Sequence, residues 1–218
     1  MPSRYDLLVF DWDGTLIDSA AHIAVSLQAA FRDLGLRVPS DEAARHVIGL
    51  GLEDTLRYLD PSLEPGRYQE VVDRYRTHFL AGDQIVELFP AVAKGIPLLH
   101  QAGYLMAVAT GKSRRGLDRS LLATGLNSYF HASRCADEGF PKPNPDMLYE
   151  IMRMLGAAPE RTLMIGDTTH DLQMAQNAGV AAVAVAHGAH ASANLESMNP
   201  LACVEDFEKL MQWLQQNG

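Results

Sequence analysis

Short runs of apolar residues alternate along this chain with segments of helical hydrophobic periodicity. Four of the runs, at residues 7–10, 104–109, 162–165 and 181–186, are typical of strands that are buried on both faces. Each run is preceded or followed by a helical pattern, and strands that alternate with helices form parallel sheets. The pattern therefore predicts an α/β fold with a doubly wound parallel sheet.

The helical patterns of this α/β part have readable ends. Leucines mark one face of a helix that ends near Gly125, and a second apolar face ends at Gly156. A last amphipathic helix over residues 207–214 should pack Trp213 partly against the sheet. Pro97 lies inside an otherwise helical stretch, where it removes a backbone donor, so we expect that helix to kink or to begin late.

The interval from residue 19 to residue 84 follows a different pattern, with helical periodicity and no convincing strand. Ser40 is placed to cap a second helix in this interval, and a third is expected over residues 67–80. The interval is therefore interpreted as an all-helical domain inserted after the first strand. The predicted division is a core of residues 1–15 and 86–218 and an inserted domain of residues 16–85.

Charge and cysteine content limit the partners and the compartment. The 218 residues include 18 Lys plus Arg and 27 Asp plus Glu, a net charge of −9, whose field repels nucleic-acid phosphates and anionic lipid. Neither a nucleic-acid nor a membrane partner is expected. Two distant cysteines, Cys135 and Cys203, make a poor disulfide framework, and the apolar run before Asp11 is too short for a signal peptide. A cytoplasmic location is therefore expected.

Polar residues follow three of the predicted strands at the point where each strand ends: Asp11, Thr110 and Asp167. The carboxyl ends of parallel strands share one edge of a sheet, which is where open α/β sheets bind ligands. Asp13 and Asp171 follow closely in sequence, so four carboxylates should lie near one another. The convergence of these residues is the main prediction for the site.

So many like charges require a divalent metal ion. Oxygen ligands favour Mg²⁺, which usually takes one or two protein carboxylates and leaves its other positions to water and substrate phosphate. Lys142 is the candidate cation nearby. The residues thus point to a magnesium site completed by a phosphate ester.

Four segments of the chain resemble, in the expected order, the motifs of the haloacid dehalogenase superfamily. They are Asp11-Trp12-Asp13-Gly14-Thr15, Thr110-Gly111, Lys142-Pro143-Asn144-Pro145 and Gly166-Asp167-Thr168-Thr169-His170-Asp171. The resemblance covers nearly the whole chain, includes a helical cap between the first two motifs, and is closest to the branch of phosphoglycolate phosphatases.

The resemblance implies a role for each motif residue. Asp11 would attack phosphorus to form an aspartyl-phosphate, and Asp13 would protonate the leaving group and then activate water. An acid at position 13, two after the nucleophile, favours phosphoryl transfer over carbon–halogen cleavage. Thr110 and Gly111 would bind the transferring phosphoryl group, and Lys142 would neutralise its charge.

The resemblance also implies the metal site. Mg²⁺ would be held by the Asp11 carboxylate, the Asp13 backbone carbonyl and Asp167, with Asp171 supporting these ligands. The implied activity is Mg²⁺-dependent hydrolysis of a small organic phosphate monoester, with phosphoglycolate as the first candidate, by a monomer or homodimer. Two alternatives stay open: a sugar-phosphate mutase of the same superfamily, and a non-catalytic sensor of a phosphorylated ligand.

Simpler interpretations apply to several of these residues taken singly. Lys142, between prolines, could be a solvated charge on an extended loop, and Asp171 could be only a helix N-cap. Gly111-Lys112-Ser113 suggests a P-loop, but that motif needs a glycine where this chain has Met106.

Two groups outside the motifs have weaker signals. His187 and His190 lie in a small-residue loop after the last predicted strand, and a mobile surface loop is the favoured interpretation over a metal pair. In the inserted domain, the candidate substrate contacts are His22, Arg45, His46, Gly49, Gly51 and Arg57.

Overall fold

A six-stranded parallel sheet forms the centre of the protein. The structure, a computed structural model, describes residues 4–81 and 87–218. The strands are β1 (Leu7–Phe10), β2 (Leu105–Thr110), β3 (Ala132–Cys135), β4 (Thr162–Gly166), β5 (Ala181–Val185) and β6 (Ala202–Val204). They lie in the order β3-β2-β1-β4-β5-β6, with every pair parallel. The predicted doubly wound parallel sheet is confirmed.

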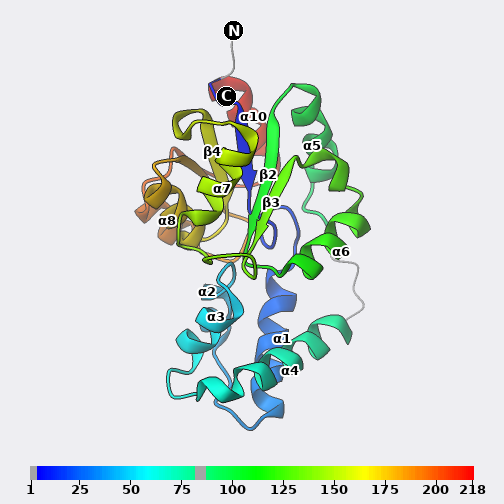
Figure 1. The fold of residues 1–218 in the computed structure, drawn as a ribbon, viewed down its shortest axis with the longest axis vertical. Coiled ribbons are helices and arrows are strands. Elements are labelled where there is room, and N and C mark those ends of the chain that lie inside the picture. The colour runs from blue at the N-terminus through cyan, green and yellow to red at the C-terminus, as the bar shows by residue number, and fades with distance from the viewer. Residues whose placement is uncertain (1–3, 82–86) are drawn as a thin grey trace.

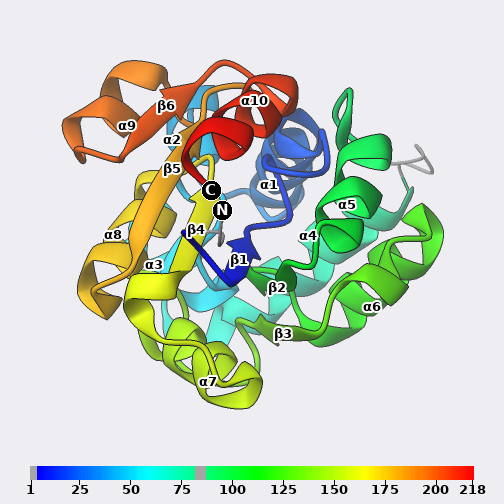
Figure 2. The ribbon, with the colours of Figure 1, turned by 90° about the horizontal axis from the view of Figure 1, so that it is seen from above.

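Helices cover both faces of the sheet because alternate strand residues point to opposite sides. Leu8 and Phe10 of β1 belong to one apolar cluster, whereas Leu7 and Val9 belong to another on the opposite face. The first cluster is covered by α5 (Val92–Gln101), α6 (Arg114–Thr124) and α10 (Phe207–Asn217), and the second by α7 (Asp146–Leu155), α8 (Thr169–Ala178) and α9 (Ser192–Ser197) (Figure 2). Trp213 of α10 packs partly buried against the first cluster, as expected.

Four helices form a second, smaller unit, here called the cap, at one end of the sheet (Figure 1). They are α1 (Ala20–Asp33), α2 (Asp41–His46), α3 (Leu52–Leu59) and α4 (Tyr68–Ala81). The cap has its own apolar core around Phe31, Leu56 and Val71, and the Ser40 hydroxyl caps α2 by accepting a bond from the Ala43 N–H. The all-helical insertion is therefore confirmed. Its exact limits stay a prediction, and the return to the core at residue 86 lies outside the described residues.

The sequence pattern missed four elements, β3, β6, α3 and α9, because none has a long apolar run or stripe. Short 3₁₀ turns, which were not predicted, complete the list: Pro65–Arg67, Asn127–Tyr129 and Pro159–Arg161. Helix α5 begins at Val92 and continues through Pro97, so the late start considered for it is wrong. Over the described part of the chain, no helix is both long enough and apolar enough to cross a membrane.

Candidate active site

The topology brings the predicted residues to one edge of the sheet, beside β1. Strand β1 pairs with β2 on one side and β4 on the other, and the chain leaves β1 and β4 in opposite directions. Such a switch point leaves a crevice beyond the strand ends. The Asp11 N–H continues the ladder by donating to the Ile165 carbonyl at 2.9 Å, which fixes the first carboxylate in the crevice.

Lys142 lies at the centre of an acidic cluster. Its Nζ is 2.8 Å from Asp11 Oδ1 and 2.6 Å from Asp171 Oδ1, and all three side chains are at most 1% exposed. Burial alone would lower the pKa of Lys142, but the carboxylates of Asp11 and Asp171 outweigh it and raise that pKa. The interpretation of Lys142 as a solvated loop charge is therefore wrong.

Asp167 is held in a closely fitting backbone pocket. Its Oδ1 accepts a bond from the Thr15 hydroxyl at 2.7 Å, and its Oδ2 accepts one from the Ala189 N–H at 2.7 Å. A Cβ atom on Gly14 or Gly188 would lie 2.2 or 2.1 Å from Asp167 Oδ2, so only glycine fits at either position. Burial, followed by the charge of Asp171, raises the pKa of Asp167 to about 7.

Asp171 does more than start a helix. The N-cap of α8 is Thr168, and Asp171 closes a capping box as the third helical residue, with Oδ2 accepting from the Thr168 N–H and hydroxyl. The N-cap interpretation of Asp171 is therefore wrong in position. Its other oxygen contacts Lys142, so one side chain both caps the first turn of the helix and orients the buried lysine.

The donor set fits a divalent cation. One carboxylate oxygen from each of Asp11, Asp167 and Asp171 lies within 4.8 Å of the others. Burial raises the pKa of Asp11 well above its ordinary value, Lys142 opposes this shift, and Asp171 and Asp167 add to it. Three buried carboxylates against one buried lysine leave a formal charge of −2, which a divalent ion would cancel. Asp11 Oδ2 has no hydrogen-bond partner among the described residues, so it is free to act as a ligand or nucleophile.

Asp13 faces the same crevice with a separate cation. Both of its carboxylate oxygens are 2.8 Å from Lys112 Nζ, and Oδ1 also accepts a bond from the Ser19 hydroxyl at 2.8 Å. Lys112 in turn lies 5.1 Å from the centre of the Phe79 ring, which belongs to the cap. Sequence reasoning missed Lys112 and Ser19, although the rejected P-loop pattern had already drawn attention to the segment that carries Lys112.

Thr110 and Gly111 line the cavity that contains Asp11 and Asp13. The Thr110 hydroxyl accepts a bond from the Lys112 N–H at 3.2 Å, which leaves its own proton available to a ligand oxygen. Gly111 meets the cap backbone, since a Cβ there would lie 2.4 Å from the Gly49 carbonyl oxygen. Each predicted motif residue is thus brought to one place, while the catalytic, phosphate-binding and metal roles assigned to them stay predictions.

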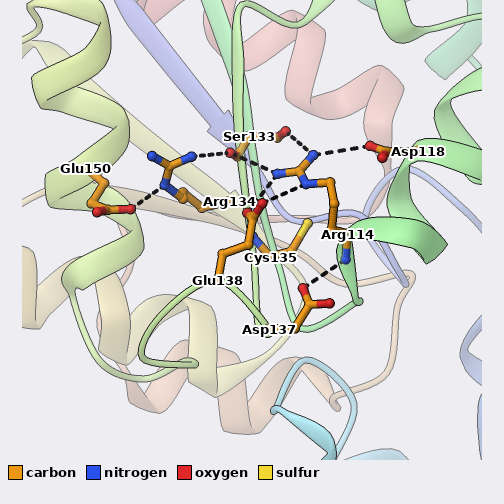
Figure 3. A network of polar contacts seen from close by, with 8 residues as sticks. All are labelled: Arg114, Asp118, Ser133, Arg134, Cys135, Asp137, Glu138 and Glu150. Carbon is orange, nitrogen blue, oxygen red and sulfur yellow. Dashed lines mark hydrogen bonds and ion pairs between the residues drawn. The ribbon is translucent and has the colours of Figure 1, made fainter.

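An arginine network anchors the two loops that border the cavity beside β3 (Figure 3). The Arg114 guanidinium contacts Glu138 at 2.8 Å and Ser133, and the Arg114 backbone N–H donates to Asp137 at 2.9 Å. Glu138 also accepts a bond from the Cys135 N–H at 2.9 Å. The network therefore ties the start of α6 to the loop after β3, which leads to Lys142.

Three histidines join the cap to the core. The Nε2 atoms of His170 and His190 both donate to the His46 carbonyl, at 2.7 and 3.0 Å. The Nδ1 atom of His190 accepts from the Thr169 N–H, and burial lowers the pKa of His190 to about 4, so this ring stays neutral. His190 is only 6% exposed, and the mobile surface loop expected around it is wrong.

The substrate contacts expected in the cap are mostly placed elsewhere. Of the six candidates, only Gly49 lines the cavity over Asp11. His22 binds the Phe79 carbonyl, Gly51 packs on Pro141, and Arg57 pairs with exposed acidic residues of its own helix. Periodicity over short helices could not show which cap residues face the core.

Comparisons with known proteins agree with this geometry. The family model described as haloacid dehalogenase-like hydrolase matches residues 8–185. A Dickeya dadantii protein named "Probable phosphatase IndB" is 38% identical over 212 residues, which cover 94% of this chain and 91% of that protein. A phosphoglycolate phosphatase of Vibrio parahaemolyticus is 29% identical over 94% of each chain. A crystal structure described as a predicted phosphoglycolate phosphatase from Haemophilus somnus superposes with a TM-score of 0.87 at 23% identity, covering 98% of this chain and 99% of the other.

Proposed function

The chain belongs to the haloacid dehalogenase-like hydrolase family, and we propose that it is a Mg²⁺-dependent phosphatase that hydrolyses a small organic phosphate monoester through an aspartyl-phosphate. One observation supports this proposal above the others. Two buried carboxylates, Asp11 and Asp13, face one cavity with separate lysines, Lys142 and Lys112. A phosphatase needs this division, because one carboxylate must attack phosphorus while the other moves a proton.

In the first step, an Asp11 oxygen attacks phosphorus and the bond from phosphorus to the ester oxygen breaks. The electron pair goes to the ester oxygen, which takes a proton from the protonated Asp13 carboxyl group, so the alcohol leaves neutral and Asp13 becomes the carboxylate that acts in the second step. Lys142, 2.8 Å from Asp11, offsets negative charge on the nucleophile and the phosphoryl group, and the Thr110 hydroxyl donates to a phosphoryl oxygen.

In the second step, a water oxygen attacks phosphorus and its proton passes to the Asp13 carboxylate. The bond from phosphorus to Asp11 breaks, which releases inorganic phosphate and restores the aspartate. Lys112 and Ser19 hold the Asp13 carboxylate in a fixed position for both transfers.

The metal site would use the Asp11 and Asp167 carboxylates and the Asp13 backbone carbonyl, with Asp171 supporting them. A divalent ion there supplies positive charge to the phosphoryl oxygens and to the ionised nucleophile. Magnesium is the expected ion because the donors are all oxygens.

Phosphoglycolate is the first substrate to test, since a relative carries the name of that activity. The sugar-phosphate mutase and the non-catalytic sensor remain the alternatives. A mutase would isomerise a sugar phosphate without releasing phosphate, and a sensor would bind a phosphorylated ligand without turnover.

The test is release of inorganic phosphate from a panel of phosphorylated metabolites, with Mg²⁺ and with chelator, by the wild-type protein and Asp11→Asn. We expect release that needs both the metal and Asp11, while circular dichroism shows that the variant keeps its fold. Wild-type turnover by Asp11→Asn in a clean preparation would overturn the nucleophile assignment.

A further inference from the structure

The cavity over Asp11 has two halves of different chemistry. Its volume is about 350 Å³, within the range of pockets that hold ligands much larger than a phosphate ion. The half formed by the core is polar and includes Asp11, Asp13, Thr110 and Lys112. The half formed by the cap is mainly apolar and includes Ile23, Leu27, Val47, Ile48, Leu52 and Phe79. The phosphoryl group belongs in the polar half, so the organic part of a substrate would extend toward the cap.

Two aromatic residues of α4 form part of the apolar half. Tyr75 and Phe79 are one helical turn apart, with ring centres separated by 5.6 Å. Phe79 is fixed from behind by His22, whose ring centre lies 4.8 Å away and whose Nε2 donates to the Phe79 carbonyl. Burial and the nearby Asp13 carboxylate raise the pKa of Tyr75, so its phenol stays neutral. The two rings are tilted by 36° to one another and form an angled aromatic wall against which a ligand ring can pack.

The cations around the cavity are in the wrong places for a second anionic group in its cap half. Lys112 is already bound by both oxygens of Asp13. The described part of the cap contributes one cation, Arg76, to the lining of the cavity. Arg76 is 52% exposed and lies 3.8 Å from Asp73. A carboxylate buried against the apolar residues would lose its hydration without gaining a cation.

Two arginines of the core also line the cavity, but at its exposed edge. Arg115 and Arg119 are separated by one turn of α6, and both are exposed. At this position they can attract a phosphorylated compound toward the site through water. They do not change the apolar character of the cap half.

We propose that the natural substrate is a phosphate monoester of an uncharged alcohol whose organic part is an apolar, ring-sized group that lies against Tyr75 and Phe79. This inference rests on the proposed phosphatase function and names its substrate class. It departs from phosphoglycolate, whose organic part is a short carboxylate that cannot use the apolar half.

The experiment separates the effects of ring and charge by comparing four phosphate esters of primary alcohols. They are benzyl phosphate, 4-carboxybenzyl phosphate, ethyl phosphate and phosphoglycolate, assayed by phosphate release with Mg²⁺. We expect kcat/KM for benzyl phosphate to exceed that for ethyl phosphate and phosphoglycolate by about tenfold or more, because only its ring fills the apolar half. The added carboxylate of 4-carboxybenzyl phosphate should remove most of this advantage.

Variants test the cap wall directly. Phe79→Ala should reduce kcat/KM for benzyl phosphate about tenfold, mainly through KM. Because Phe79 also contacts Lys112, Ile23→Ala provides a second test on a cavity residue from a different helix, and it should shift selectivity in the same direction. The matched control is Val25→Ala, which changes a residue of α1 that is 61% exposed, and its kinetics should equal those of the wild type.

A further variant should weaken the preference for an uncharged organic part. Leu80 lines the cavity but is 49% exposed, so Leu80→Lys adds a cation without burying it in the protein core. We expect this change to raise the ratio of kcat/KM for 4-carboxybenzyl phosphate over benzyl phosphate about fivefold.

The outcomes distinguish this inference from the proposed function. Phosphate release that depends on metal and Asp11, but is as fast with ethyl phosphate or phosphoglycolate as with benzyl phosphate, overturns the substrate class and leaves the phosphatase intact. No release from any of the four esters or from the metabolite panel, by folded protein, overturns both.

Discussion

Gly111 lies where the core meets the cap, and a single methyl group added at this position should push the two apart. A Cβ on Gly111 would lie 2.4 Å from the Gly49 carbonyl oxygen and 2.7 Å from that of Leu50. Both atoms belong to the backbone between α2 and α3, so they cannot rotate away as a side chain could. In Gly111→Ala, this loop must retreat by at least 0.6 Å to reach the 3.0 Å that real Cβ atoms keep.

The retreat should reduce activity more than stability. Gly111 follows Thr110, and the displaced loop borders the cavity, so the cap would close incompletely over the substrate. A misplacement near 1 Å can cost about a hundredfold in rate, and we expect kcat/KM to fall about ten- to a hundredfold. The clash can be relieved by slight opening of the cap, so the unfolding free energy should fall by less than about 1 kcal/mol, or roughly 2–4 °C in Tm.

The assay is steady-state phosphate release beside thermal unfolding, with Gly66→Ala as the control. Gly66 also lies in the inserted region, but a Cβ there meets no atom within 4 Å, so this variant should keep wild-type kinetics and Tm. Wild-type kcat/KM in Gly111→Ala would refute the contact as a requirement for closure. A fall in Tm of more than about 10 °C would instead show that the substitution damages the core.

Three further predictions concern the charges of the site. Lys112→Met should lower kcat by about ten- to a hundredfold, because Asp13 loses the cation that positions it. Lys112→Arg should restore part of the rate. A kcat that is unchanged in Lys112→Met would argue against a role for the contact between Asp13 and Lys112. Gly188→Ala should weaken Mg²⁺ binding about ten- to a hundredfold in calorimetric titration, since its Cβ would lie 2.1 Å from Asp167 Oδ2, and wild-type affinity would contradict this. The fold raises the pKa of Asp167 to about 7, so folded protein binds this proton more tightly than the unfolded chain does. Metal-free protein should therefore lose stability as the pH rises from about 4 to 7. Mg²⁺ should therefore raise Tm more at about pH 7.5 than at about pH 5, and an equal rise at both would count against Asp167 as a ligand.

The sequence predicted the centre of the sheet well because central strands are buried on both faces. The predicted limits of β1 match the observed ones, the predicted run for β2 is shifted by one residue at both ends, and that for β4 is one residue short at its end. Strands at the edges of the sheet need no continuous run of apolar residues. β3 has the sequence Ala-Ser-Arg-Cys and β6 has only three partly buried residues, so neither could be recognised from hydrophobicity.

The sequence could predict only those site residues that the ends of the strands position. Asp11 and Asp167 follow neighbouring strands directly, so topology alone brings them together. The pairing of Asp13 with Lys112 depends on side chains 99 positions apart and on the loop that carries Lys112, neither of which produces a periodic signal. The burial of Lys142 likewise depends on how a proline-containing loop packs on α8, which hydrophobic patterns do not record.

The two lysines explain how neighbouring aspartates can take different roles. Asp13 pairs with its own lysine, Lys112, near the cap, whereas Asp11 shares Lys142 with Asp171 and lies beside Asp167. The acidic group therefore keeps an uncompensated charge, and burial opposes ionisation of Asp11 until a divalent cation balances it. Metal binding would thus favour the ionised form that the proposed nucleophile Asp11 needs, while Lys112 supplies the positive charge beside Asp13, the proposed acid and base. A reaction with one nucleophile and one proton carrier requires two carboxylates in such different environments.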